Sequence, residues 1–329
     1  MAAVARTEKN RRLPVAVLQV LGVAAAYYAG TCIGTLKGVT RLDGVNVSPL
    51  WPSTGIALTA LFLLGIRVWP GITLGTFLSL ATLGPLNASA LGIMAGSTLA
   101  PVCSCLLLRR VGFRIELDRL RDGMALVFLG ALTGMLISAT TAAGVLALNG
   151  LLPLGFGATW LAWWTGDAMG VLLVTPFLLV LCRIRLPLPT HRWAETTAIV
   201  VSAAVVTPLA VTRSLTLIFL FFPVLIWAAL RFELAGSAPY ALFVSVLAIF
   251  EATKSTGVFA SHSLTERLVS LQALNGSVAL TSLLLAATIT EQNRVRMKIE
   301  KACDALAQVV EEIAPQRARP WPPDRRRRD

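Results

Sequence analysis

Runs of about twenty apolar residues recur along this chain from Leu13 to Thr290, and they constrain its fold more than any other feature. A helix rises about 1.5 Å per residue, so about twenty residues cross the ~30 Å hydrocarbon core of a bilayer. The strands of a membrane barrel are shorter and alternate in polarity, so the runs favour helices. Only 14% of the residues are charged, against about a quarter in soluble domains. The sequence therefore predicts an all-α, polytopic transmembrane helix bundle.

The apolar runs divide into about ten spans, with eight as the lower number. We expect spans over residues 13–36, 50–66, 68–86, 88–108, 124–148, 159–182, 196–212, 214–230, 234–251 and 267–290. An even number of spans places both termini on the same side. The expected domains are a basic N-terminus (1–12), an integral membrane sensory domain (13–290), a cytoplasmic helix (291–314) and a disordered Pro- and Arg-rich tail (315–329).

The basic residues are divided unequally between the two sides of this span model. One side receives 24 of the 29 lysines and arginines, which include those of the N-terminus, the loop around Arg110 and the C-terminal segment. Basic loops remain in the cytoplasm, so both termini are predicted to be cytoplasmic. The net charge of +12 then reflects orientation and contact with membrane lipids rather than nucleic-acid binding.

The chemistry-bearing residues form no pattern for a metal, a cofactor or catalysis. The five cysteines lie in or beside spans apart from Cys303, and the two histidines, His191 and His262, fall on opposite sides of the membrane. A metal site would require further ligands. The sequence contains no phosphate-binding loop, zinc-protease motif or nucleophile elbow. We therefore expect a protein that is not an enzyme and has no metal, no cofactor and no catalytic residue.

Glycines at helical spacing predict close packing of the spans. Three pairs have the Gly-x-x-x-Gly spacing that lets two helix backbones approach each other. They are Gly71 and Gly75, Gly92 and Gly96, and Gly130 and Gly134.

Asp167 lies inside the apolar stretch "WLAWWTGDAMGVLLVTP". A carboxylate in hydrocarbon costs roughly 2.5–3.5 kcal/mol on insertion scales, so its presence indicates a functional site. Gly166 and Gly170 flank Asp167 and are expected to open a groove, while Trp163 lies one turn above on the same face. These residues predict a binding pocket. The alternative is a structural contact of Asp167 with a neighbouring helix, through a threonine or Arg231.

Three ordered segments resemble a known family. "SPLWPSTGIALTALFLLGIRVWPGITLGTF", "WLAWWTGDAMGVLLVTPFLL" and "FPVLIWAALRFEL" are similar to the membrane-associated sensor domain, type 1 (the MASE type 1 family) of bacteria, over about residues 15–290. The resemblance implies a sensory module in the plasma membrane, attached to histidine kinase or diguanylate cyclase output domains. One position departs from the family, because Glu233 stands where the resemblance predicts a glycine. The matching motif positions are Trp51, Pro52, Thr54, Gly55, Trp69, Pro70, Gly71, Trp164, Gly166, Asp167, Gly170, Pro176, Trp227 and Arg231.

The segment after the last span carries an apolar seam with alternating steps of four and three residues, the pattern of a coiled coil. The seam positions are Val295, Ile299, Ala302, Leu306, Val309 and Ile313. We expect a signalling helix in a parallel homodimer, with an amphipathic helix on the membrane surface as the alternative. An output domain needs ~100–200 residues, so the short segment after Pro315 predicts a stand-alone form without one.

Two functions remain open from the sequence. The first is a sensor that binds an unknown small molecule or a membrane partner within the bundle and relays to a separate kinase, cyclase or transporter. The second is a small-solute transporter in which Asp167 is the coupling or substrate-binding group. The expected ligand-binding residues of the sensor are Trp51, Pro52, Thr54, Gly55, Trp163, Trp164, Gly166, Asp167, Gly170 and Arg231.

Overall fold

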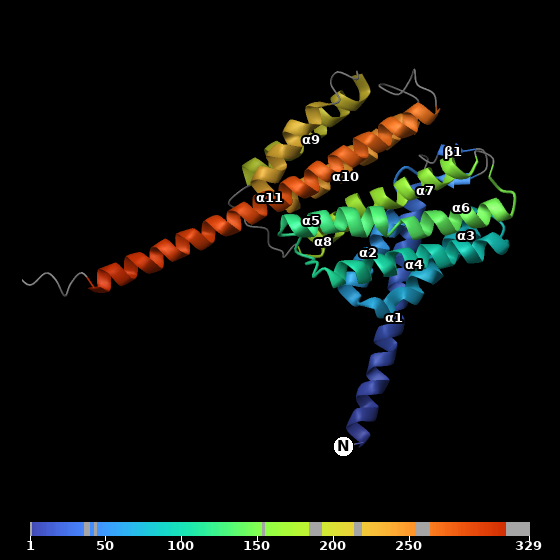
Figure 1. The fold of residues 1–329 in the computed structure, drawn as a ribbon, viewed down its shortest axis with the longest axis horizontal. Coiled ribbons are helices and arrows are strands. Elements are labelled where there is room, and N and C mark those ends of the chain that lie inside the picture. Colours follow the sequence, from blue (N-terminus) through green and yellow to red (C-terminus); the bar gives the residue numbers. More distant parts are fainter. Residues whose placement is uncertain are drawn as a thin grey trace, which may run out of the picture.

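The structure is a computed structural model, and it describes residues 2–35, 40–42, 45–152, 155–183, 193–213, 219–253 and 264–313. Apart from one two-stranded antiparallel ribbon, the regular elements of this part of the chain are helical (Figure 1). In chain order they are α1 (Ala2–Thr35), β1 (Thr40–Leu42), β2 (Val45–Val47), α2 (Pro52–Leu64), η1 (Ile66–Val68), α3 (Trp69–Leu83), α4 (Ala88–Arg110), α5 (Leu120–Ala125), η2 (Leu126–Thr133), α6 (Leu136–Leu148), α7 (Phe156–Met169), η3 (Gly170–Val174), α8 (Thr175–Leu181), α9 (Trp193–Arg213), α10 (Phe221–Thr253) and α11 (Leu264–Ile313).

The predicted polytopic helix bundle is confirmed, and the number of long spans is the lower of the eight to ten expected. Within the described residues, 8 helical segments are long and apolar enough to cross a membrane. The expected span 50–66 is the shorter helix α2, which has only 13 residues. The long segments are Pro14–Thr35, Ile66–Leu83, Ala88–Arg110, Leu120–Leu148, Phe156–Leu181, Trp193–Val211, Phe221–Ala252 and Val269–Val310.

The expected spans 214–230 and 234–251 both fall in α10, apart from residues 214–218, which lie outside the described part. The backbone of Glu233 is not helical, with φ 52° and ψ −135°. A Cβ on Gly236 would lie 2.6 Å from the carbonyl oxygen of Ala228. Eight residues of straight helix would separate these two positions by about 12 Å. The chain therefore turns sharply at Glu233, and α10 consists of two halves that meet at this turn.

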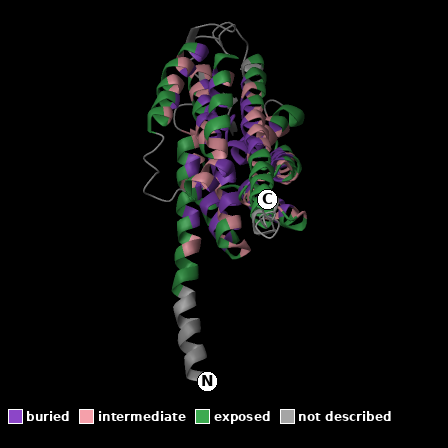
Figure 2. Ribbon diagram, turned by 90° about the vertical axis from the view of Figure 1, so that its left-hand side faces the viewer, coloured by how far each residue is buried: buried purple, intermediate pink, exposed green. Residues whose placement is uncertain are grey.

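The three glycine pairs lie at helix contacts. Gly71 and Gly75 of α3 face α1, and a Cβ on Gly71 would lie 2.5 Å from the carbonyl oxygen of Val20. The pair in α4 faces α6, while the pair around η2 includes Gly130, which faces Leu108 of α4. Close backbone approach replaces hydrophobic burial as the source of attraction where lipid surrounds the helices. Buried residues accordingly concentrate inside the bundle (Figure 2).

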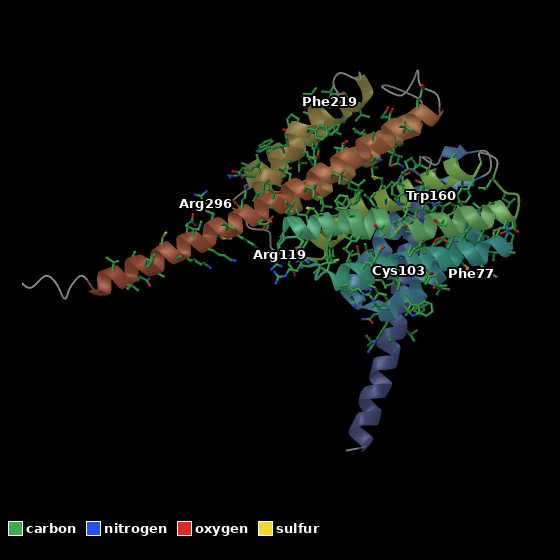
Figure 3. The ribbon with its side chains drawn as sticks, viewed as in Figure 1. Phe77, Cys103, Arg119, Trp160, Phe219 and Arg296 are labelled. Carbon is green, nitrogen blue, oxygen red and sulfur yellow. The ribbon has the colours of Figure 1, made fainter. Side chains whose placement is uncertain are left out.

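Charged contacts gather at one end of the bundle. Arg183 pairs with Glu116 at 2.6 Å, and Arg294 pairs with the buried Asp118. Arg119 and Arg296 lie where α11 leaves the bundle, whereas Phe77 and Trp160 lie nearer the other end (Figure 3). The loop after α4, the end of α8 and the exit of α11 therefore lie together at one end of the bundle.

Helix α11 continues without a break from the bundle into a projecting rod (Figure 1). Its first part is packed among other helices, with Leu271, Val278 and Leu283 buried. Residues 295–310 are all exposed. Residue 290 therefore marks a change of surroundings within one helix.

Candidate functional site

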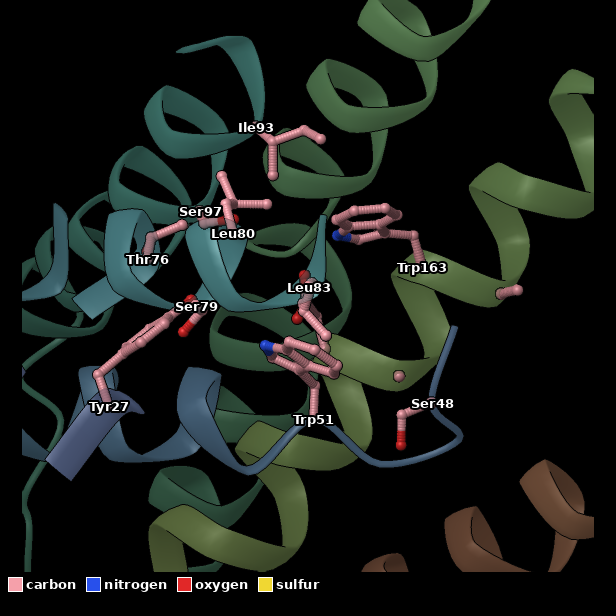
Figure 4. A pocket seen from close by; sticks show the side chains of 13 residues that line it. Tyr27, Ser48, Trp51, Thr76, Ser79, Leu80, Leu83, Ile93, Ser97 and Trp163 are labelled. Carbon is pink, nitrogen blue, oxygen red and sulfur yellow. The ribbon is translucent and has the colours of Figure 1, made fainter. Parts of the chain in front are cut away.

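A cavity lies at the bundle end opposite the charged contacts, between α1, α3, α4, α7 and the segment that joins β2 to α2. Trp51 and Trp163 extend into it, with Leu80 and Leu83 of α3 nearby (Figure 4). The cavity volume is ≈ 70 Å³. A cavity needs only ~10–15 Å³ to hold one water molecule, so this one has room for more than one. The lining residues are Tyr27, Ser48, Trp51, Thr76, Ser79, Leu80, Leu83, Ile93, Ser97, Ala162, Trp163, Gly166 and Asp167.

Asp167 lies at the wall of this cavity and is only 5% exposed. Its Oδ1 accepts a 2.6 Å hydrogen bond from the hydroxyl of Thr54 in α2. The hydroxyl of Ser138 in α6 also interacts with this carboxyl group. Asp167 therefore connects α7 to two neighbouring helices and also borders the cavity.

Glycines let the start of α2 dock against α7 and η3. The backbone N–H of Trp51 donates to the carbonyl oxygen of Gly166 at 3.1 Å. A Cβ on Gly166 would lie 2.5 Å from the carbonyl oxygen of Ser48, and one on Gly170 would collide with the carbonyl oxygen of Trp51. A Cβ on Gly55 would meet Gly170 in turn. The space beside these glycines is therefore filled by the chain itself rather than left as an open groove.

The structure brings most of the expected site residues together. Trp51, Trp163, Gly166 and Asp167 line the cavity. Thr54 holds the carboxyl group, while Pro52, Gly55 and Gly170 are buried beside it at the contact of α2 with α7 and η3.

Two expected residues lie elsewhere. The indole N–H of Trp164 donates to the carbonyl oxygen of Leu132 at 2.8 Å, so its side chain faces η2 instead of the cavity. Arg231 lies at the other end of the bundle, where it pairs with Glu195 of α9. The partner of Asp167 is thus a threonine, one of the two alternatives considered from the sequence, and not Arg231.

The cavity wall that α1, α3 and α4 provide is not predicted from the sequence. Thr76, Ser79, Leu80 and Leu83 of α3 all line the cavity. Their spacing of three and four residues is the signal that places them on one helix face. The sequence could not show that this face meets Asp167, because the pairing of helices is decided by tertiary packing.

A π-helical stretch, η3, begins directly after α7. Such stretches widen the helix locally and occur often at functional sites. The hydroxyl of Thr175 bonds to the carbonyl oxygen of Gly55 at 3.2 Å, so α2 also contacts the chain beyond this stretch. The irregular backbone lies where α2 and α7 meet.

The short segment between β2 and α2 connects the cavity to α11. Ser48 and Trp51 line the cavity. Between them, the carbonyl oxygen of Pro49 accepts a 3.0 Å hydrogen bond from the side-chain amide of Gln272 in α11. A displacement of residues 48–51 would therefore act directly on α11.

A family model matches residues 18–293, and its description is MASE1. The chain belongs to the MASE1 family. The match covers the whole bundle, including the cavity and most of the buried part of α11. MASE1 is an integral membrane, sensor-type domain, and the match adds no catalytic domain. Neither the comparison with curated proteins nor that with solved structures found a match. Among the residues described in this MASE1 chain, no three His, Cys, Asp or Glu side chains are grouped to hold a metal ion.

Proposed function

We propose that this chain is a signal-input protein of a bacterial membrane. A small molecule binds in the cavity beside Asp167, and the resulting helix movement passes through α11 to a separate partner. The observation that carries the proposal is the hydrogen bond from Gln272 to Pro49, because it joins the cavity wall to the helix that leaves the bundle.

Contacts at the exit of α11 support the relay. The carboxylate of Glu233 accepts hydrogen bonds from Thr290 at 2.9 Å and from Asn293 at 2.8 Å. Glu291 accepts one from the backbone N–H of Leu120 at 3.0 Å. With the pair between Arg294 and Asp118, α11 is held by polar contacts from two sides over residues 290–294. Polar contacts of this kind can exchange partners, so they suit a helix that changes position.

We also propose an orientation in the membrane and a set of partners. Both termini lie in the cytoplasm, membrane lipids surround the bundle, and the seam of residues 295–313 pairs with a second copy. A kinase, a cyclase or a transporter receives the signal. Reporter fusions after residues 115 and 329 are expected to be cytoplasmic, and one near residue 152 external. An external reading after residue 329 would overturn this orientation.

A substitution that fills the cavity tests the relay without a known ligand. Ala162→Phe adds a ring to the cavity wall, whereas Ala95→Phe adds the same group on the exposed face of α4. Hydrogen exchange in nanodiscs is expected to change over residues 270–294 in Ala162→Phe alone. Identical exchange in both variants and the wild type, with all three folded, would contradict the relay.

The alternative is a small-solute transporter in which Asp167, buried at the cavity wall, is the coupling or substrate-binding group. Uptake of a solute into proteoliposomes, lost in Asp167→Asn, would establish it in place of the sensor.

A further inference from the structure

The described lining of the cavity includes an acidic side chain and no basic one. Among its described lining residues, Asp167 is the one carboxylic acid, and none is a lysine, arginine or histidine. The side chain of Asp167 is held by hydroxyl groups, which supply no positive charge. A buried carboxylate without a cationic partner is costly in a low-dielectric interior. A ligand that brings a positive charge would reduce this cost.

Aromatic rings form much of the remaining wall. Tyr27, Trp51 and Trp163 come from three different elements and line one cavity. Trp51 and Trp163 both extend into it in the close view (Figure 4). The face of an aromatic ring attracts a cation, most strongly for tryptophan and when water is excluded. Several rings around one volume form the arrangement that binds substituted ammonium groups.

The size of the cavity and its hydroxyl groups further restrict the class of ligand that fits. The cavity volume of ≈ 70 Å³ suits a small molecule. Room for more than one water molecule fits a small organic molecule. The hydroxyls of Thr76, Ser79 and Ser97 can bond to one polar group on such a molecule.

We propose that the cavity binds a small organic cation, a quaternary or substituted ammonium compound with its charged group between the indole rings and Asp167. This proposal rests on the proposed function, because it identifies the ligand class of the same cavity.

Choline and its uncharged isostere 3,3-dimethylbutan-1-ol provide a matched pair of probes. Binding of each to the full chain in nanodiscs is measured by calorimetry and by tryptophan fluorescence. Choline is expected to bind at least tenfold more tightly than the alcohol. In Asp167→Asn this preference should fall at least tenfold, whereas Asp122→Asn, which neutralises a buried carboxyl outside the cavity, should keep it.

Trp163 supplies a second test that does not alter the carboxyl group. Trp163→Phe should retain the preference for choline and Trp163→Leu should lose it, with both variants folded. Equal affinity for the two probes would overturn the inference of a cation while leaving a ligand-binding cavity. Failure to bind either probe, together with an exchange response in Ala162→Phe, would reject the ligand class and keep the sensor. Failure of both experiments would reject the proposed function itself.

Discussion

The hydroxyl of Thr54 donates a 2.6 Å hydrogen bond to Oδ1 of Asp167, across 113 positions of sequence. This bond joins the start of α2 to the middle of the α7–η3–α8 segment. It lies at the wall of the cavity, so the same carboxyl group contributes to the fold and faces the proposed ligand. Variants at the two positions separate these contributions.

Thr54→Val should lower the stability of the protein more than Asp167→Asn does. Valine has no hydroxyl group, so the buried Oδ1 of Asp167 loses the hydrogen bond that Thr54 donates. The loss of one partner from a buried hydrogen bond costs about 1–3 kcal/mol. An amide at position 167 keeps an oxygen that can accept the bond from Thr54, so the cost is smaller. Thermal unfolding of both variants in detergent measures which of them is less stable. A lower melting temperature for Asp167→Asn than for Thr54→Val would show that the charge, rather than the bond, holds these helices.

Gly170→Ala should destabilise the bundle by about 1–3 kcal/mol, since the new methyl group would collide with the backbone of Trp51. Gly157 is the matched control, because it lies in the same apolar segment and a Cβ there meets nothing within 4 Å. Gly157→Ala should be neutral or stabilise the helix by up to about 1 kcal/mol. Similar losses in the two variants would contradict the close contact between α2 and η3.

Glu233→Gly should loosen α11 with little change in overall stability. Glycine adopts a positive φ without the strain of about 1–3 kcal/mol that other residues carry there, but it removes the two hydrogen bonds to Thr290 and Asn293. These effects oppose each other. Hydrogen exchange over residues 288–294 should rise, while Glu233→Gln, which can still accept both bonds, should change it less. Unchanged exchange in Glu233→Gly would mean that this side chain does not hold α11.

The pair of Glu116 and Arg183 predicts a small dependence on pH. Partial burial acts to raise the pKa of Glu116, but hydrogen bonds from its own backbone and from Arg183 outweigh it and hold the pKa below its usual value. A lowered pKa means that the stabilisation is present above the unfolded value of about 4.3 and is lost as the pH falls through the folded value.

Glu116→Gln measures this contribution. The pair is substantially exposed, with side-chain accessibilities of 39% and 45%, so solvent screening limits it to about 0–1 kcal/mol near neutral pH. The difference in unfolding midpoint between the wild type and Glu116→Gln should shrink as the pH is lowered. A difference that grows toward acid would contradict the assigned sign.

A cysteine at Leu306 should form a disulfide-linked dimer in membranes, in a background where Cys303 is replaced by serine. Leu306 is 65% exposed on the projecting part of α11, and burial of its seam is the expected driving force for pairing. Asp304→Cys, off the seam, should crosslink less. Equal crosslinking at both positions would indicate random encounters instead of a coiled coil.

The sequence located the parts of the molecule that carry unusual chemistry. Asp167 was found because a carboxylate in an apolar run stands out, and Glu233 because it replaces an expected glycine. The walls formed by Tyr27, Ser79 and Ser97 were not found. Serine and threonine are common in membrane helices, and the face that each presents depends on which helices pack together. For the same reason, the sequence does not show that the start of α2 packs against Gly170.

The distance between spin labels at Arg110 and Ile299, measured in nanodiscs, tests most directly whether the cavity controls α11. The two positions lie at the end of α4 and on the exposed part of α11, so their separation reports movement of the rod against the bundle. We predict a shifted distance distribution in Ala162→Phe, no shift in Ala95→Phe, and loss of the shift when Gln272→Leu is added to Ala162→Phe. The same distribution in the wild type and all these variants would contradict the account.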